Sequence, residues 1–289
     1  MKTIRSIERV IAPPPPHMVG DGFRVHNFFP SGGIQSKQRM SPFFMLDYAS
    51  KFEFPPSKTP RGVDVHPHRG FETVTIAYHG KIAHHDSAGN KGVIEEGDVQ
   101  WMTAASGVLH KEYHEASFSR EGGPFQMVQL WVNLPAANKM TTPRYQELKK
   151  ESMGRLKFDG GELEIIAGEF DEVKGPAKTF TPVHLSNLHL KKEGAFTLDF
   201  PSHYNTGLLV VKGSVQINGT SASTNHFVLL SNDGEDINIS ASEESTILIL
   251  AGEPIQEPLV AYGPFLMNTW EEIEQAISDF NLGKFGVLD

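Results

Sequence analysis

The chain has 289 residues, of which 39% are hydrophobic and 21% are charged, which is enough to bury one large or two ordinary domain cores. It contains no cysteine, which excludes disulfides, thiolate metal sites and cysteine nucleophiles. Its formal net charge is −9 and no segment concentrates Lys and Arg, so we expect no direct binding to nucleic acid.

The N-terminal segment, residues 1–16, has basic residues but no long apolar stretch, and it contains Glu8 and four consecutive prolines. This pattern does not fit a secretory signal peptide. No run of about 18 apolar residues occurs in the sequence, so no transmembrane helix is expected. Together these features predict a cytoplasmic protein.

Short segments rich in β-branched and aromatic residues recur along the chain, separated by Gly, Asn, Asp or Pro. Many short strands with turn residues between them indicate an all-β sandwich or barrel. The clearest of these segments are residues 73–78, 99–102, 127–132, 163–167, 208–211 and 246–250.

The chain also shows an internal repeat. Residues 72–80 resemble residues 205–213, because both are apolar runs that end in a glycine turn. The polar segment 136–161 between them is interpreted as a connection. We therefore predict two barrels made by duplication, with residues 1–135 as the first domain and residues 136–289 as the second.

One helix is predicted near the C-terminal end. Thr269 is a candidate N-cap, Glu272 completes a capping box three residues later, and Gly283 supplies a stop. We expect this helix to cover barrel surface rather than to carry a function. Its apolar face consists of Ile273, Ala276, Ile277 and Phe280.

Two pairs of residues with metal-binding side chains have the same spacing. His66 and His68 are two apart, as are His110 and Glu112. Alternate side chains of a strand share a face, so each pair can point into one cavity. On neighbouring strands the pairs offer three nitrogen ligands and one oxygen ligand, which suits a divalent Fe, Ni, Cu or Zn ion.

Two further groups lie near these pairs in the sequence. Glu72 has the same parity as the paired histidines, so it is either a weak fifth ligand or a group that orients a histidine, and we place it outside the ligand set. His84, His85 and Asp86 precede a turn. We predict a surface loop for them, with support of the metal ligands as the alternative.

At these residues the sequence resembles the cupins. The spacing of His66, His68 and Glu72 is similar to the first cupin motif, and Gly97 with His110 is similar to the second. More narrowly, the chain resembles the pirin family. The resemblance is carried by residues 41–47, 66–75, 86–90, 97–103 and 262–268.

The pirin resemblance implies a bicupin: two double-stranded β-helix (jelly-roll) barrels, a short C-terminal helix and a metal in the N-terminal barrel alone. Pirins hold iron there through three His and one Glu, at positions that match His66, His68, His110 and Glu112. Fe(II) is therefore the expected metal, with Ni, Mn, Cu or Zn as alternatives.

Two parts of the sequence differ from the pattern expected for a metal site: the second half of the chain, and the segment next to the expected site in the first half. When the halves are aligned on their glycine turns, Asp199 and Pro201 stand where the paired histidines do, and Ile237 and Ile239 lie near the other ligand positions. The second barrel should therefore bind no cation. Near the expected site, Ala105 and Ser106 replace a glycine and a basic residue usual in the family, which changes its rim.

Four protein ligands leave two positions open on an octahedral ion, enough for a chelating substrate and dioxygen. The resemblance implies an activity similar to quercetin 2,3-dioxygenase, in which a flavonol-type ring is opened, both oxygen atoms are incorporated and carbon monoxide is released. Glu112 would act as the catalytic base that takes the proton of the substrate hydroxyl. The expected partners are a small aromatic substrate and dioxygen, without a membrane.

Two alternatives remain open at this point. Eukaryotic pirins are iron-dependent transcriptional cofactors, so the chain could be a redox-sensitive regulator without turnover that acts through a protein partner. It could also be a different cupin enzyme with another small substrate, because fold alone does not choose among these functions.

Overall fold

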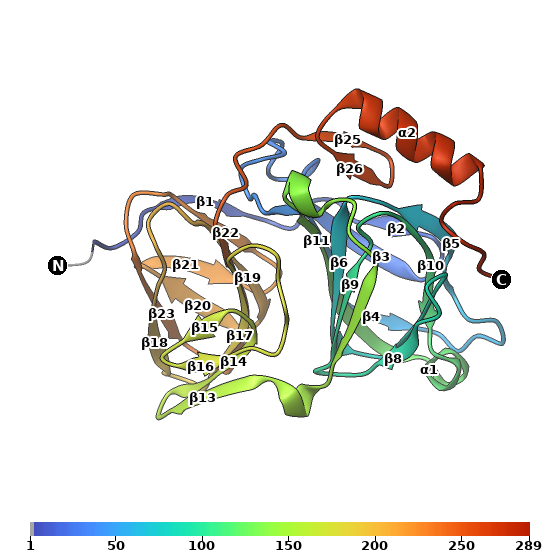
Figure 1. Ribbon diagram of the computed structural model, residues 1–289. Helices are drawn as coiled ribbons and strands as arrows, with labels where there is room; N and C mark the ends of the chain where they lie inside the picture. The colour runs from blue at the N-terminus through green and yellow to red at the C-terminus, as the bar shows by residue number, and fades with distance from the viewer. Residues whose placement is uncertain (1–2) are drawn as a thin grey trace. The chain divides into compact units, whose positions relative to one another are not determined.

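The computed structural model describes residues 3–289, and most of their regular structure is β-strand (Figure 1). These residues form two compact units, each built from three segments of chain. We name as the first barrel Pro15–Asn27, Phe43–Lys150 and Ile255–Asp289. The second barrel contains the described residues up to Pro14, Phe28–Pro42 and Glu151–Pro254.

The first barrel is built from two antiparallel sheets. A seven-stranded sheet has the order β12 (Arg144–Leu148), β9 (Val99–Thr103), β6 (Phe71–His79), β11 (Gly123–Asn133), β4 (Phe43–Phe54), β3 (Phe23–Phe29), β2 (His17–Val19). A four-stranded sheet has the order β5 (Gly62–His68), β10 (Val108–His114), β7 (Ile82–Asp86), β8 (Lys91–Ile94). The short helices α1 (Ala116–Glu121) and η1 (Ala136–Asn138) also belong to it.

The second barrel has the same plan. Its seven-stranded sheet has the order β1 (Ile7–Ile11), β22 (Phe227–Leu230), β19 (Asn205–Lys212), β24 (Ser245–Gly252), β17 (Val183–Leu190), β14 (Gly161–Ala167), β13 (Gly154–Phe158). Its four-stranded sheet has the order β18 (Ala195–Asp199), β23 (Asp236–Ala241), β20 (Ser214–Ile217), β21 (Thr220–Ser223). A hairpin of β15 (Glu169–Phe170) and β16 (Val173–Lys174) and the turn η2 (Lys150–Ser152) complete the connections.

The repeat seen in the sequence is also a structural repeat. Strands β6 and β19 occupy the same place in their sheets, and each is followed by a glycine, Gly80 or Gly213, with φ of +86° or +88°. Glycine adopts this conformation without the strain that a Cβ introduces. The predicted all-β bicupin fold is therefore confirmed.

The interiors of the two barrels differ in chemistry. The second barrel is filled by aliphatic side chains, because the inward positions of its strands are Leu, Ile and Val. In the first barrel, histidines and acidic or amide side chains are buried among the apolar ones. The fully buried aliphatic residues of the second barrel include Leu208, Val210, Ile237, Ile239 and Ile249.

The predicted C-terminal helix is present as α2 (Trp270–Asn281). Thr269 accepts a hydrogen bond from the Glu272 amide, and the Glu272 side chain accepts one from the Thr269 amide, so the capping box is confirmed. In the first barrel, α2 packs on the hairpin of β25 (Val260–Tyr262) and β26 (Phe265–Met267) (Figure 1).

The polar segment 136–161 is more than a connection. It contains β12, which pairs with β9 and extends the first barrel, and β13, which pairs with β14 in the second. A boundary between residues 135 and 136 stays a prediction. Among residues 3–289, no helix combines the length and apolar character needed to cross a membrane.

Candidate metal centre

Three of the predicted ligands meet on two neighbouring strands of the first barrel. His66 and His68 lie on β5, and His110 lies on β10, where it is the register partner of His66. The ring centroids of His66 and His110 are 4.2 Å apart, and those of His68 and His110 are 4.6 Å apart. Each of the three offers a ring nitrogen within 4.8 Å of the others.

The hydrogen bonding of these histidines fits a metal ion. Both ring nitrogens of His110 and Nδ1 of His68 are buried and have no hydrogen-bond partner among residues 3–289. Nδ1 of His66 lies 2.8 Å from the Asp64 carbonyl oxygen, which leaves Nε2 for a ligand bond. Buried polar atoms without partners are costly in a protein interior, and a bound cation would satisfy them.

Burial lowers the pKa of His68 and of His110 well below the ordinary histidine value, and the neighbouring imidazoles lower both further. Both rings are therefore neutral at pH 7. A neutral imidazole is the form that binds a metal, so the donor set can hold one.

Glu112 lies beside this cluster and is held by two neutral side chains. Gln129 Nε2 donates to Glu112 Oε2 at 3.1 Å, and Thr75 Oγ1 lies 3.2 Å from Glu112 Oε1. Its carboxylate comes within 4.8 Å of His110 and His84, rather than of all three clustered histidines. The structure thus brings His66, His68 and His110 together and places Glu112 next to them. The ligand role of these four residues stays a prediction.

The surface loop predicted for residues 84–86 is wrong, because all three residues lie on β7 and both His84 and Asp86 are buried. His84 lies on β7 and is completely buried, with its ring 5.4 Å from that of His110 and stacked on Tyr145. Its Nε2 lies 3.5 Å from Asp86 Oδ2. His85 points away and contacts the Tyr113 hydroxyl at 2.9 Å. The alternation of a strand explains this difference.

Glu72 does not face the histidines. Thr75 on the same strand contacts Glu112, and side chains three apart on a strand point to opposite faces. Gly70, with φ of +90°, breaks the strand between His68 and Glu72, so the shared parity in the sequence has no structural meaning. Glu72 is buried, accepts a hydrogen bond from Thr103 at 2.6 Å, and has its pKa raised to about 7 by burial.

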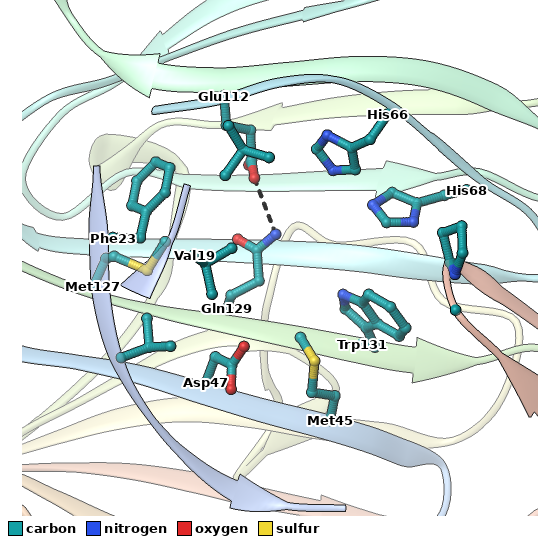
Figure 2. Close-up of a pocket in the computed structure, with 14 residues that line it drawn as sticks. Val19, Phe23, Met45, Asp47, His66, His68, Glu112, Met127, Gln129 and Trp131 are labelled. Carbon is teal, nitrogen blue, oxygen red and sulfur yellow. Dashed lines mark hydrogen bonds between the residues drawn. The ribbon is translucent and has the colours of Figure 1, made fainter. Parts of the chain in front are cut away.

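A cavity of about 460 Å³ opens beside the cluster, a volume typical of small-molecule sites (Figure 2). His66, His68 and Glu112 line one side of it, and Asp47 and Gln129 are its other polar groups. The rest of the wall is apolar: Val19, Phe23, Val25, Met45, Val63, Met127 and Trp131, with Gly263 and Pro264.

Sequence reasoning missed Gln129 and Asp47. The sequence does carry a signal for both. Residues 127, 129 and 131 share one face of β11, and residues 45 and 47 share one face of β4. A single polar residue on each otherwise apolar face marks a position where a side chain faces something other than core.

The strand order defines two cupin barrels, and the histidine cluster of the first barrel could hold a metal ion. Among residues 3–289, the second barrel has no such cluster, and its strands β18 and β23 bring Leu198 opposite Ile237. The sequence profile described as Pirin matches residues 22–132, and the one described as Pirin C-terminal cupin domain matches residues 185–286.

Relatives agree over nearly the full length. The chain is 45% identical to the "Putative quercetin 2,3-dioxygenase" of Pseudomonas aeruginosa (93% of this chain, 94% of the relative). It is 39% identical to a pirin-like protein of Solanum lycopersicum (92% and 88%). The crystal structure of a quercetin 2,3-dioxygenase from Acinetobacter baumannii is similar with a TM-score of 0.93 and 43% identity (99% and 100%). The chain belongs to the pirin family.

A more distant structure supports the fold alone. A bacterial pirin from Escherichia coli in complex with nickel(II) has a TM-score of 0.66 and 22% identity, covering 86% of this chain and 99% of that one.

Proposed function

We propose that this protein is a metal-dependent dioxygenase similar to quercetin 2,3-dioxygenase. The observation that carries the proposal is a cluster of three imidazoles with the Glu112 carboxylate beside it, and His66, His68 and Glu112 line the wall of a mostly apolar cavity. Such a cavity suits a flat aromatic substrate, and the relatives named as quercetin dioxygenases support the same class.

We assign His66, His68, His110 and Glu112 as the protein ligands, with Fe(II) as the first expectation and Ni, Mn, Cu or Zn as alternatives. When bound, the ion supplies Lewis acidity toward a substrate hydroxyl and the means to react with dioxygen. The imidazoles hold their place through the strand pairing of β5 and β10.

Glu112 is assigned as the base that takes the proton of the substrate hydroxyl. Thr75 Oγ1 lies nearer to Gln129 Oε1, at 2.9 Å, than to Glu112 Oε1, at 3.2 Å. Oε1 is therefore the carboxylate oxygen with the weaker partner, and we assign the proton to it. Gln129 keeps Oε2 fixed and so orients the carboxylate.

The apolar wall excludes water from the reacting end of the substrate. Trp131, whose ring centroid lies 5.3 Å from that of His68, and Met45 offer flat and adaptable surfaces against which an aromatic ring can pack. The cavity favours catalysis over a purely regulatory metal, which would need no substrate-sized space. A cytoplasmic location and a protein partner stay predictions.

The test loads metal-free protein with Fe(II), Ni(II), Mn(II) or Cu(II) and then adds quercetin and dioxygen. We expect loss of flavonol absorbance with release of one carbon monoxide per flavonol for at least one metal. His110→Ala should abolish turnover, whereas His189→Ala, which removes a half-buried histidine of the second barrel, should not. No turnover with any of these metals would contradict the proposal and favour the regulatory alternative.

A further inference from the structure

Asp47 is a buried carboxyl group in the cavity wall that the proposed chemistry does not use. It lies on β4 with 8% of its surface exposed and lines the same cavity as the histidine cluster. Figure 2 shows it across the cavity from Glu112 and His66, with Gln129 between them.

Among residues 3–289, only one oxygen of this carboxyl group has a hydrogen-bond partner. Asn27 Nδ2 donates to Asp47 Oδ1 at 2.7 Å, and Oδ2 has no hydrogen bond to any residue in the part of the chain that the structure describes. A carboxyl oxygen without a protein partner in the wall of a cavity can accept a hydrogen bond from a ligand or from water. Burial also raises the pKa of Asp47, while Asn27 opposes that rise.

The strand register gives the separation between Asp47 and Thr75, the residue that contacts Glu112. Asp47 is opposite Gln129 on β11, and Gln129 is opposite Thr75 on β6, whose hydroxyl contacts Glu112. These residues form a row across three neighbouring strands. Two strand spacings amount to roughly 10 Å, so a ligand of two or three linked rings can reach from one end of the row to the other.

We propose that Asp47 is a specificity-determining residue that accepts a hydrogen bond from a hydroxyl on the ring of the substrate farthest from the metal centre. This inference rests on the proposed function and narrows its substrate class to aromatic compounds with hydroxyls at both ends. The same carboxyl group disfavours a substrate with a carboxylate at the far end, because two acidic groups would meet in an apolar wall.

The experiment compares two ligands that share the hydroxyl at the metal end. Quercetin carries hydroxyls on its other rings, and 3-hydroxyflavone carries none. Binding to the nickel-loaded protein is measured without oxygen by quenching of tryptophan fluorescence, so the readout does not depend on turnover. Wild type should bind quercetin about tenfold more tightly, the factor expected for one hydrogen bond to a buried group.

The variants then locate that preference. Asp47→Leu should weaken quercetin binding about tenfold while leaving 3-hydroxyflavone within about twofold, and Asp47→Asn should lie between. Asp98→Asn is the matched control, because Asp98 is a buried aspartate of the same barrel that bonds to Lys149 and does not line the cavity. It should keep the wild-type preference.

Equal binding of the two ligands to wild type, no binding of either, or an unchanged preference in both Asp47 variants would overturn the inference. The Asn variant keeps the test valid if the Leu variant does not fold. If quercetin is turned over but the Asp47 variants bind quercetin in preference to 3-hydroxyflavone as strongly as wild type does, this inference is wrong and the proposed function stands. A preference that depends on Asp47, without turnover by any metal, would contradict only the proposed function.

Discussion

Glu112 depends on neighbours for its orientation, and Gln129 is the more tractable of them. Gln129→Leu removes the donor to Glu112 Oε2 and leaves the carboxylate free to rotate. Loss of a group that orients a ligand typically lowers metal affinity by about 10- to 100-fold, and we expect a decrease in that range for Ni(II), measured by competition with a chelator. Gln126→Leu is the control, because it removes a buried glutamine of the same strand that bonds to Tyr48. Equal affinities of the two variants would contradict the role of Gln129.

The raised pKa of Glu72 predicts how the free energy of unfolding depends on pH. Burial raises its pKa to about 7 from 4.5, so between these pH values the unfolded chain releases a proton that the folded chain retains. Its contribution to stability is therefore greatest below pH 4.5 and declines as pH rises to 7. Glu72→Gln keeps an acceptor for Thr103 and removes this decline.

We therefore expect Glu72→Gln to be more stable relative to wild type at pH 8 than at pH 5, by up to about 3 kcal/mol. Urea unfolding of both proteins at the two pH values measures this difference. An identical difference in unfolding free energy at pH 5 and pH 8 would show that Glu72 is ionised in the folded protein at both.

The residues of the cluster were predictable to unequal degrees. His66, His68 and His110 could be found because equal spacing on two strands is a local property. Glu72 could not be placed correctly, because the left-handed Gly70 interrupts the strand after His68. His84 reaches the cluster only through the pairing of β7 with β10, which is a contact between distant segments.

At the scale of elements, α2 is fastened to the turn that follows the second histidine of the cluster. The buried Arg69 guanidinium bonds to Asp279 of α2 at 2.9 Å and lies 4.7 Å from the Phe285 ring centroid. Hydrogen bonds from Lys284 and Arg69 lower the pKa of Asp279 to about 2. The stabilisation from this carboxylate is therefore present above its ordinary pKa of 3.8 and is lost as pH falls through about 2.

Asp279→Asn should release the helix, because it leaves a buried guanidinium without its anion. We expect amide hydrogen exchange in α2 at pH 7 to accelerate by roughly tenfold or more, with the strands of the second barrel unchanged. Glu274→Gln, which neutralises an exposed carboxylate on the same helix, is the control. Similar exchange in both variants would mean that apolar packing alone holds the helix.

The helix and its capping box were predictable, because both are local patterns. Of its predicted apolar face, Ile273 and Ala276 are buried, whereas Phe280 is 39% exposed. The surface that α2 covers could not be predicted, because Arg69 and its partner Asp279 are 210 residues apart in the sequence. The edge strands are a second example: β1 pairs with β22 although more than two hundred residues separate them, and only the folded chain shows that pairing.

At the scale of the whole molecule, two barrels of identical strand order carry different interiors. Where β5 and β10 bring His66 opposite His110, β18 and β23 bring Leu198 opposite Ile237, and the sequence alignment places Asp199 and Pro201 at the positions of His66 and His68. Duplication was visible in the sequence from one pair of glycine turns. The common strand order, including an edge strand on each seven-stranded sheet, became apparent only from the pairing.

This asymmetry predicts a metal content of about one ion per chain. Elemental analysis of protein loaded with Ni(II) and freed of excess metal should give that ratio for wild type and for His189→Ala. His110→Ala should retain little or none. Two ions per chain, or full occupancy in His110→Ala, would place a metal outside the cluster.

Met45 and Met127 place two thioether sulfurs in the wall of the cavity where dioxygen is proposed to react. Oxidation would turn each into a polar sulfoxide, which packs poorly against an aromatic ring. Such an enzyme would lose activity in proportion to the number of turnovers rather than to the time elapsed. Its lifetime would be counted in catalytic cycles, and spent molecules would carry a mass increase of about 16 Da for each oxidised methionine.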